Sequence, residues 1–396
     1  MEFRYLAADK LNDRQAKALV SRLIYSVEGI SRCWLDEDTG HIVFEGIEED
    51  AITDLTELLD RMAEKEKKIR HLTSRVLRET PDAPPLSDVP ARRLEVEAVF
   101  AKDGSVRKGA AVQVMQALQL YFLELAMKYD PHLRYYPTMM KREALEPCSY
   151  IQTFPQNLFF VAEFPHQLPV LEQVKETKDP GALTRMTEHV LTPAQCFHSY
   201  AELQGQTLSE PMILTSQGTC YRHETPWRVG NQRMNEFVLR EILFVGPADF
   251  VETTRRALVE DAWQTAVDFG LTARLETALD PFYFSEDAAK GTVQLMGDMK
   301  IELVVSVNDG QDQYAVSSMN NMREALCLAY EIHGPDGKPY HSGCTGFGIE
   351  RWLYALLSTH GADLAEWPAS VLAALKLDRA GEGDGHADSR QLHAAK

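Results

Sequence analysis

The sequence GTCYRHETPWRVGNQRMNEFVLREILFVG, residues 218–246, reads as two antiparallel strands joined by a charged loop. Side chains along a strand alternate between two faces, so Cys220, Arg222 and Glu224 share one face of the first arm. On the second arm, one face is apolar except for a single carboxylate: Phe237, Leu239, Glu241, Leu243 and Val245. A carboxylate in such a row must be paired, protonated or bound to a metal.

The loop between the two arms carries Arg228 and Arg233 among glycine, asparagine and glutamine residues. This composition suits a loop that closes over an anionic ligand. The pattern of Arg222 and Glu224 two residues apart also fits a surface ion pair, which is the commoner origin of any single instance. The hairpin therefore predicts an anion site only in combination with the rest of the chain.

Length and composition indicate an ordinary globular protein. The chain has 396 residues, 44% of them apolar and 25% charged, which suits about two or three domains. Its net charge of −18 gives no general attraction to nucleic acid, although a local basic strip remains open. No run approaches the roughly 20 apolar residues that span a bilayer, and no signal peptide opens the chain. We therefore expect a cytoplasmic protein without a membrane segment.

The first 70 residues predict the order strand, helix, strand, strand, helix. The predicted strands are residues 3–7, 30–35 and 41–45. Asn12 can cap the first helix, which would end at Gly29, and Asp50 can cap the second. This order resembles a small ferredoxin-like domain of the heavy-metal-associated type. Cys33 stands alone where that family has a CxxC metal site, so an accessory or docking module without metal is favoured.

Prolines 81, 84, 85 and 90 mark a boundary between this region and the rest of the chain. The C-terminal residues are rich in Gly, Asp, Ala and His, which predicts disorder. The expected organisation is a ferredoxin-like domain over 1–70, a linker over 71–92, a main domain over 93–377 and a disordered tail over 378–396.

Two further stretches of the main domain carry recognisable patterns. Residues 110–129 predict a long helix, which leads into a short strand over 133–140 that contains Pro137. Residues 341–360, HSGCTGFGIERWLYALLSTH, combine glycines that let the backbone approach a ligand closely with a helix whose first turn carries Arg351. This second stretch is the most specific single signal in the chain.

Together these patterns resemble the three motifs of class II aminoacyl-tRNA synthetases. The helix, strand and proline of residues 110–140 look like motif 1. The hairpin, with Arg222, Glu224 and Phe237 in order, looks like motif 2, and GFGIER, residues 346–351, looks like motif 3. The resemblance implies an α+β fold, a class II synthetase-like antiparallel sheet flanked by helices with the small ferredoxin-like domain at the N-terminus.

Residues 145–164 and 191–200 narrow the resemblance to one branch. Both are similar to segments of the amino acid:[carrier protein] ligases, truncated class II relatives that themselves resemble the zinc-dependent seryl-tRNA synthetases of methanogens. The resemblance covers the chain from about residue 135 to about residue 361.

The resemblance implies an ATP site, in which Arg222, Glu224 and Arg351 are the predicted catalytic groups. Arg222 would grip the α-phosphate, Arg351 the γ-phosphate, and Phe237 would stack on the adenine. Glu224 would contact the adenine or the substrate amine, and Arg233 would reach the nucleotide from the loop.

Two later strands complete the predicted site. Residues 299–307 read as a buried strand, and Glu302 on it either lies near ATP and Mg²⁺ or pairs with Lys300. The segment YAVSSMNN resembles the strand that lines the amino acid pocket of seryl enzymes, which implies that Ser318 and Asn320 contact the substrate.

The six cysteines of the chain show no CxxC spacing, so isolated thiols or metal ligands are favoured over disulfides. Read alone, Cys196 and Cys344 would be buried free thiols. The resemblance matches both of them and Glu241 to zinc ligands, although 45 and 103 residues separate the three. Zn²⁺ held this way would keep its fourth position open for the α-amino group of a small amino acid.

The resemblance implies an AMP-forming ligase that activates a small amino acid with ATP and passes it to the phosphopantetheine thiol of an acyl or peptidyl carrier protein. A homodimer is implied as well. The alternatives are an atypical zinc-dependent seryl-type tRNA synthetase and a paralogue that binds but does not activate. Against tRNA, the N-terminal region has no pair of long helices, and no segment joins basic residues with interleaved aromatics.

Overall fold

The computed structural model describes residues 1–69, 71–81, 86–101, 106–280, 282, 284 and 287–378. The predicted disordered tail, apart from Asp378, lies outside the described residues.

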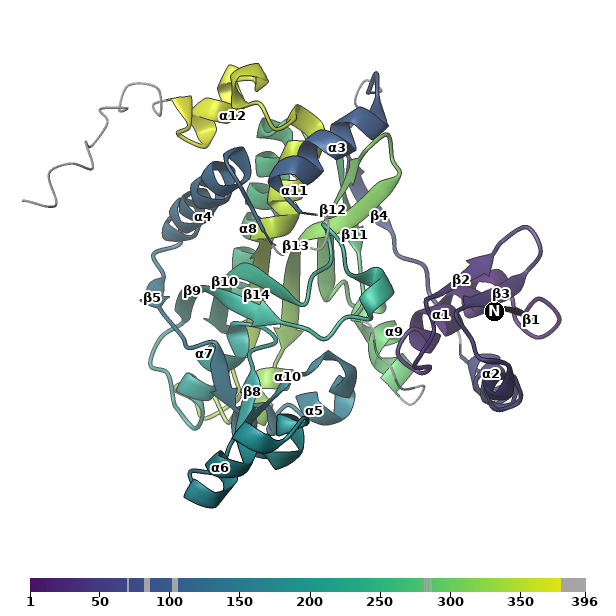
Figure 1. The fold of residues 1–396 in the computed structure, drawn as a ribbon. Coiled ribbons are helices and arrows are strands. Elements are labelled where there is room, and N and C mark those ends of the chain that lie inside the picture. The colour runs from purple at the N-terminus through teal and green to yellow at the C-terminus, as the bar shows by residue number, and fades with distance from the viewer. Residues whose placement is uncertain are drawn as a thin grey trace, which may run out of the picture.

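An eight-stranded sheet forms the centre of the molecule, with the strand order β4-β11-β12-β13-β14-β10-β9-β5 (Figure 1). Neighbouring strands are antiparallel, except that β5 runs parallel to β9. The strands are β4 (Val76–Glu79), β5 (His132–Arg134), β9 (Met212–Tyr221), β10 (Glu236–Gly246), β11 (Ala273–Thr277), β12 (Lys300–Val307), β13 (Asp312–Arg323) and β14 (His341–Gly348). The hairpin predicted over residues 218–246 is therefore present as β9 and β10. However, β9 ends at Tyr221, so Arg222 and Glu224 lie in the loop and not on the first strand as predicted.

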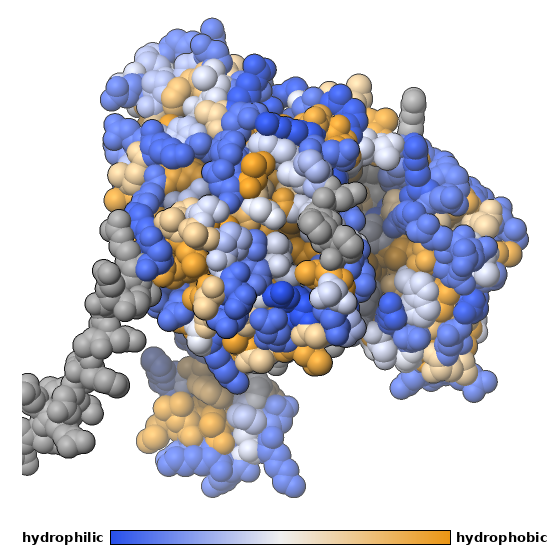
Figure 2. All heavy atoms as spheres, turned by 90° about the horizontal axis from the view of Figure 1, so that it is seen from above, coloured by the Kyte–Doolittle hydropathy of each residue, from blue (hydrophilic) through white to orange (hydrophobic). Residues whose placement is uncertain are grey.

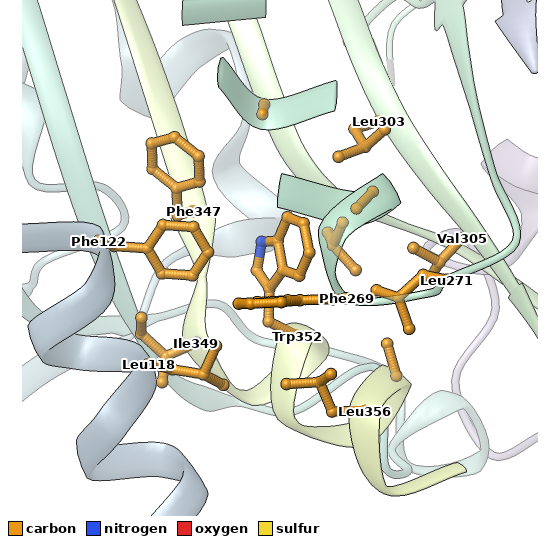
Figure 3. Close-up of a cluster of buried hydrophobic side chains, with 14 of the residues drawn as sticks. Leu118, Phe122, Phe269, Leu271, Leu303, Val305, Phe347, Ile349, Trp352 and Leu356 are labelled. Atoms are coloured by element: carbon orange, nitrogen blue, oxygen red, sulfur yellow. The ribbon is translucent and has the colours of Figure 1, made fainter. Parts of the chain in front are cut away.

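Three helices, α4 (Ala110–Met127), α8 (Ala248–Asp268) and α11 (Ile349–His360), bury their apolar faces against one side of this sheet. The helix α3 (Val89–Val99) and the terminal α12 (Ala369–Ala374) extend the same cluster. In Figure 3 the ring of Phe122 on α4 lies beside that of Phe347 on β14, with a centroid distance of 4.4 Å. Trp352 of α11 completes the stack, 5.3 Å from Phe122. The antiparallel sheet flanked by helices confirms the predicted α+β architecture.

Among the described helices, α4 is long and apolar enough by composition to cross a membrane. Its residues Val114, Leu118 and Phe122 are fully buried in the core cluster. Burial of this kind explains the apolar sequence as that of a core helix.

The N-terminal region folds as predicted into β1 (Glu2–Leu6), α1 (Asp13–Leu23), β2 (Arg32–Asp36), β3 (His41–Glu45) and α2 (Ile52–Glu66), with the sheet order β1-β3-β2. Asn12 caps α1, accepting from the Gln15 N–H at 3.0 Å. The first helix ends at Leu23, before Gly29. Asp50 does not cap the second helix, because it lies inside a 3₁₀ turn that precedes α2.

Two predicted boundaries differ from the structure. The segment expected as a linker over 71–92 contains β4, which pairs with β11 at the edge of the main sheet, and also the start of α3. The strand expected over 133–140 is divided into β5 and β6 (Met139–Lys141), which belong to different sheets. Pro137 lies between them, and its missing N–H does not support a continuous ladder.

A small antiparallel sheet has the order β6-β8-β7, and Figure 1 shows its strand β8 below the main sheet, near α5, α6 and α7. Its other strands are β7 (Phe160–Glu163) and β8 (Arg185–Leu191), and the helices near it are α5 (Tyr150–Thr153), α6 (Leu168–Glu176) and α7 (Cys196–Leu203). The remaining helices are α9 (Ala288–Met296) and α10 (Ala325–Ala329). Seen from above, hydrophilic residues cover most of the surface, with apolar patches scattered among them (Figure 2).

Candidate functional site

The face of the sheet opposite the helical core carries a row of polar residues. Glu241 on β10 lies opposite Ser216 on β9 and Gly346 on β14. Gly346 in turn lies opposite Ser318 on β13, which lies opposite Glu302 on β12. Residues directly opposite in an antiparallel sheet share one face. Five strands therefore present one continuous polar row.

The neighbouring row on this face contains Cys344, which lies opposite Leu243 and Asn320, and Asn320 lies opposite Lys300. The intervening residues of β10, such as Ile242, point into the helical core instead. Strand alternation thus places the predicted site residues of β10, β12, β13 and β14 on the same side of the sheet.

Arg222, Arg233 and Arg351 converge at one end of this face. Burial, followed by the positive charges of Arg233 and Arg222, lowers the pKa of Arg351 to about 10. Its guanidinium donates to the carbonyl oxygens of Gln232 at 2.8 Å and Ala315 at 2.9 Å, which holds it in the first turn of α11. Half-buried cations gathered in this way suit the binding of an anion.

Arg222 and Phe237, to which the resemblance to motif 2 assigns ATP contacts, lie together. The Arg222 guanidinium carbon lies 5.2 Å from the centre of the Phe237 ring, and its Nε donates to the carbonyl of Pro193 at 3.2 Å. Burial opposes the charge of Arg222, but neighbouring groups, first Tyr150 and also Glu241, raise its pKa. The guanidinium therefore stays charged beside an aromatic surface.

Glu224 is buried next to this cluster, with 8% of its surface exposed. Its carboxylate accepts from Arg233 Nη1 at 2.9 Å and from the Tyr25 hydroxyl at 3.4 Å. Its own N–H donates to Asn235 Oδ1 at 2.8 Å, which ties the two ends of the loop together.

Glu302 pairs with Lys300 at 3.2 Å, which confirms one of the two interpretations of this carboxylate. Lys300 also contacts Asp280 at 2.7 Å. Burial opposes the charge of Lys300, but Asp280 and Glu302 together raise its pKa. Glu302 also lies close enough to Arg351 to favour the charged form of the arginine. A role of Glu302 near the phosphates of ATP stays a prediction. Asp280 was not found from the sequence, since it lies in a loop without any pattern.

Cys196 contacts both Glu241 and Cys344. The backbone N–H of Cys196, at the start of α7, donates to Glu241 Oε2 at 2.6 Å. A hydrogen bond with the Cys344 thiol, burial and the charge of Glu241 raise the pKa of Cys196. Burial raises the pKa of Glu241 despite the hydrogen bonds that it accepts from Cys196. Asn320 donates to Cys344 Sγ at 3.5 Å.

The described part of the chain contains no group of three His, Cys, Asp or Glu side chains in the arrangement of a metal site. The chemistry of the donor set nevertheless suits zinc, because two sulfur atoms and one carboxylate are its usual ligands. Glu241 Oε2 is engaged by the Cys196 N–H, whereas Oε1 lies on the side of Gly346 and Ser318. The zinc assignment therefore stays a prediction. On binding zinc, the thiols of Cys196 and Cys344 would lose their hydrogen bond to each other and bind the metal instead.

Gly346 has room for an added methyl group on the site face of β14. A Cβ atom built on this glycine would stand 3.9 Å from Glu241 Oε1 and 3.9 Å from Ser318 Oγ, with no closer contact. Asn320 Nδ2 lies 3.4 Å from Ser318 Oγ. The two predicted substrate residues are thus brought together next to the cysteine and carboxylate cluster.

Sequence reasoning missed Gln195, which is fully buried beside the hairpin and donates to the Thr219 carbonyl at 3.3 Å. Gly218 makes room for it, since a Cβ there would lie 2.6 Å from Gln195 Nε2. Its position directly before Cys196, inside the family-like segment 191–200, was the signal that could have identified it. Tyr25, from the N-terminal domain, had no such signal.

Comparison with known proteins identifies relatives in sequence and in structure. No family model matches the chain. The amino acid–[acyl-carrier-protein] ligase 1 of Bradyrhizobium diazoefficiens is 30% identical over 248 residues, which are 61% of this chain and 76% of that protein. The type-2 serine–tRNA ligase of Methanocaldococcus jannaschii is 26% identical over 261 residues, which are 61% of this chain and 49% of that protein.

Among solved structures, the seryl-tRNA synthetase of M. kandleri in complex with A. aeolicus tRNASec superimposes with a TM-score of 0.68 at 18% identity, covering 96% of this chain and 78% of that one. The seryl-tRNA synthetase of Pyrococcus horikoshii complexed with ATP gives a TM-score of 0.58 at 13% identity, covering 83% and 79%. At such identities these structures show the fold, which is that of class II synthetases. The sequence similarity to the Bradyrhizobium enzyme goes further: this chain belongs to the family of the amino acid–[acyl-carrier-protein] ligases.

Proposed function

We propose that the protein activates a small amino acid with ATP and transfers it to the phosphopantetheine thiol of a carrier protein. The observation that carries this proposal is the convergence of Arg222, Arg233 and Arg351 beside the cluster of Cys196, Glu241 and Cys344 on one face of the sheet. The cations suit a triphosphate, and the cluster suits an amine held by a metal. Membership of the ligase family supports the same pairing of substrates.

In the first step, a carboxylate oxygen of the amino acid attacks the α-phosphorus of ATP. The bond from this phosphorus to the bridging oxygen of the β-phosphate breaks, and pyrophosphate leaves. Arg222 and Arg351 stabilise the charge on the phosphates, and Arg233 closes over them from the loop. Phe237 packs against the adenine, and Glu224 fixes the adenine or the substrate amine. No side-chain nucleophile is needed.

Zinc held by Cys196, Glu241 and Cys344 would supply a Lewis-acid position that binds the α-amino group of the substrate. Ser318 and Asn320 line the space beside this position and contact the side chain of the amino acid. A Cβ on Gly346 would already lie 3.9 Å from Glu241 Oε1 and Ser318 Oγ, so we expect small amino acids, the class of glycine, alanine and serine, as substrates. Glu302 would bind Mg²⁺ together with the phosphates.

In the second step, the thiol sulfur of the carrier arm attacks the carbonyl carbon of the adenylate. The thiol loses its proton, AMP leaves, and an aminoacyl thioester forms. We place both steps in the cytoplasm, in the domain of residues 93–377, with residues 1–70 as an accessory domain. A homodimer through the motif 1 region is part of the proposal, supported by the exposed side chains of Leu133 in β5 and of Tyr135 directly after it.

tRNA is the alternative acceptor. The fold similarity to the M. kandleri synthetase covers 96% of this chain and so includes the N-terminal domain. Against it, α1 and α2 have only 11 and 15 residues, which is short for a pair of helices that grips tRNA. A further alternative is a paralogue that binds amino acid or tRNA without activating either.

ATP–pyrophosphate exchange across a panel of amino acids tests the first step, and absence of exchange with every amino acid would refute it. For the second step, labelled amino acid and ATP are offered together with total tRNA and a set of phosphopantetheinylated carrier proteins. We expect label on a carrier protein, removable by hydroxylamine because the product is a thioester. Label on tRNA alone would overturn the carrier assignment while leaving the activation step intact.

A further inference from the structure

We infer that Tyr25 of the N-terminal domain is a positioning residue for the ATP site, acting through Glu224. The inference rests on the proposed function, in which Glu224 contacts the adenine or the substrate amine. It gives the N-terminal domain a task in the activation step, although this domain lies outside the part of the chain that resembles the ligases.

The Tyr25 hydroxyl joins the two domains at one carboxylate. It donates to Glu224 Oε2 at 3.4 Å, and these residues are 199 positions apart in the sequence. Arg228 Nη1 donates to the same hydroxyl at 3.4 Å. Arg233 Nη1 holds the other carboxylate oxygen, Oε1, at 2.9 Å. Glu224 is therefore fixed from two sides, once by its own loop and once by the N-terminal domain.

The loop also packs on the N-terminal domain. Residues Pro226–Arg228 form a 3₁₀ turn in the middle of the hairpin loop. Trp227 at the centre of this turn packs against the core cluster of the N-terminal domain, which includes Leu23 of α1. Two consecutive residues, Trp227 and Arg228, thus contact the domain by an apolar and a polar interaction, while Tyr25 reaches back to the carboxylate.

The contacts of the Glu224 carboxylate indicate that Tyr25 positions this group and does more than attach the N-terminal domain to the main domain. The carboxylate that Tyr25 contacts lies in the same ion pair as Arg233, which repels Arg351 within the arginine cluster. Loss of the Tyr25 contact leaves Glu224 held on one side only, so the carboxylate and the loop sample more orientations before ATP binds. Restricting a group before binding improves affinity by reducing the entropy lost on association.

The test is Tyr25→Phe in the full chain, with ATP–pyrophosphate exchange measured over a range of ATP concentrations. We expect the KM for ATP to rise about threefold to tenfold, because the hydrogen bonds of this hydroxyl to Glu224 and Arg228 are both removed, with kcat changed by less than about twofold. Trp227→Leu, which removes the apolar contact of the same turn, should act in the same direction.

The matched control is Tyr5→Phe. Tyr5 lies in the same domain, and its hydroxyl donates to Asp60 at 2.7 Å, away from the hairpin loop. This variant loses a shorter hydrogen bond and should leave the KM for ATP unchanged. A rise of equal size in Tyr5→Phe would show that the effect is general to the domain and would overturn the inference.

Hydrogen–deuterium exchange provides a readout that needs no activity. In Tyr25→Phe, peptides over residues 225–233 should exchange faster than in the wild type, and in Tyr5→Phe they should not. Unchanged exchange and an unchanged KM in Tyr25→Phe would refute the positioning role while wild-type turnover upholds the proposed function. If the wild type shows no pyrophosphate exchange at all, the proposed function fails, and the deuterium measurement still decides whether Tyr25 orders the loop.

Discussion

Two glycines of β14 face opposite sides of the sheet, and replacing each with alanine should have different consequences, one for substrate selection and one for stability. Gly346 faces the site, where an added Cβ would meet Glu241 Oε1 and Ser318 Oγ at 3.9 Å, an ordinary van der Waals distance. Gly343 faces the core, where the Cβ would lie 2.3 Å from Phe244 Cε2 and 2.6 Å from the Asn320 carbonyl oxygen. One methyl group therefore fits in the first place and overlaps other atoms in the second.

For Gly346→Ala we expect a folded protein with a smaller amino acid pocket. One methyl group in a substrate pocket changes discrimination by about 1–3 kcal/mol, or about 10-fold to 200-fold in kcat/KM. The loss should be smallest for glycine and should increase with alanine and serine. For Gly343→Ala we expect the free energy of unfolding to fall by about 1–3 kcal/mol, because the aromatic ring and the strand backbone must both shift.

The assays are pyrophosphate exchange with each amino acid and thermal unfolding followed by circular dichroism. Zinc content measured on the same samples separates a filled pocket from a lost metal. An unchanged kcat/KM for all amino acids in Gly346→Ala would refute the placement of the substrate beside this glycine. A melting temperature for Gly346→Ala as low as that of Gly343→Ala would refute the assignment of the two faces.

Three other expectations concern the metal, pH and magnesium. Cys344→Ala should reduce bound zinc from about one per chain to nearly none and should abolish pyrophosphate exchange. The control is Cys327→Ala, which replaces a buried thiol outside the predicted ligands and should retain both zinc and exchange activity. Zinc retained in Cys344→Ala would contradict the ligand assignment. Burial lowers the pKa of His198 to about 4. The folded state thus binds fewer protons than the unfolded state, so His198 contributes stability that is present above about pH 6.5 and lost as the pH falls toward 4, up to about 3 kcal/mol. Urea unfolding at pH 7 and pH 5 should show a smaller difference in His198→Asn than in the wild type, and equal differences would disprove this contribution. Glu302→Gln should raise the Mg²⁺ concentration needed for half-maximal exchange by about tenfold, and an unchanged requirement would mean that Glu302 only balances Lys300.

Strand periodicity in the sequence was sufficient to orient the central residues of the site. Alternation along β10 sends Glu241 to one face and Ile242 to the other, and the structure has this arrangement. The glycine-rich turn into a helix likewise identified β14 and α11, because a strand that ends at Gly348 leads directly into a helix with Arg351 in its first turn. Both patterns involve residues that are close together in the chain, so they can be recognised in a single sequence.

Contacts between distant segments could not be predicted in this way. Arg351 meets Arg233 and Arg222 only because β14 pairs with β10 and β10 with β9. The pairing of Lys300 with Asp280 depends on a loop between β11 and β12 that has no pattern of its own. Strand order is set by long-range packing, and no spacing rule specifies it.

The strand β4 went unpredicted because its residues are all exposed and its neighbourhood is rich in proline. Its consequence concerns how the protein can be shortened. The Thr80 N–H donates to the Ala273 carbonyl, and the Arg78 guanidinium lies 4.6 Å from the Trp263 ring, so β4 closes the outer edge of the sheet along β11. A truncated protein that begins at residue 93, where composition places the main domain, would expose the backbone groups of β11 as an open edge, which is a template for self-association. A truncation that begins near Arg75 would keep this edge covered.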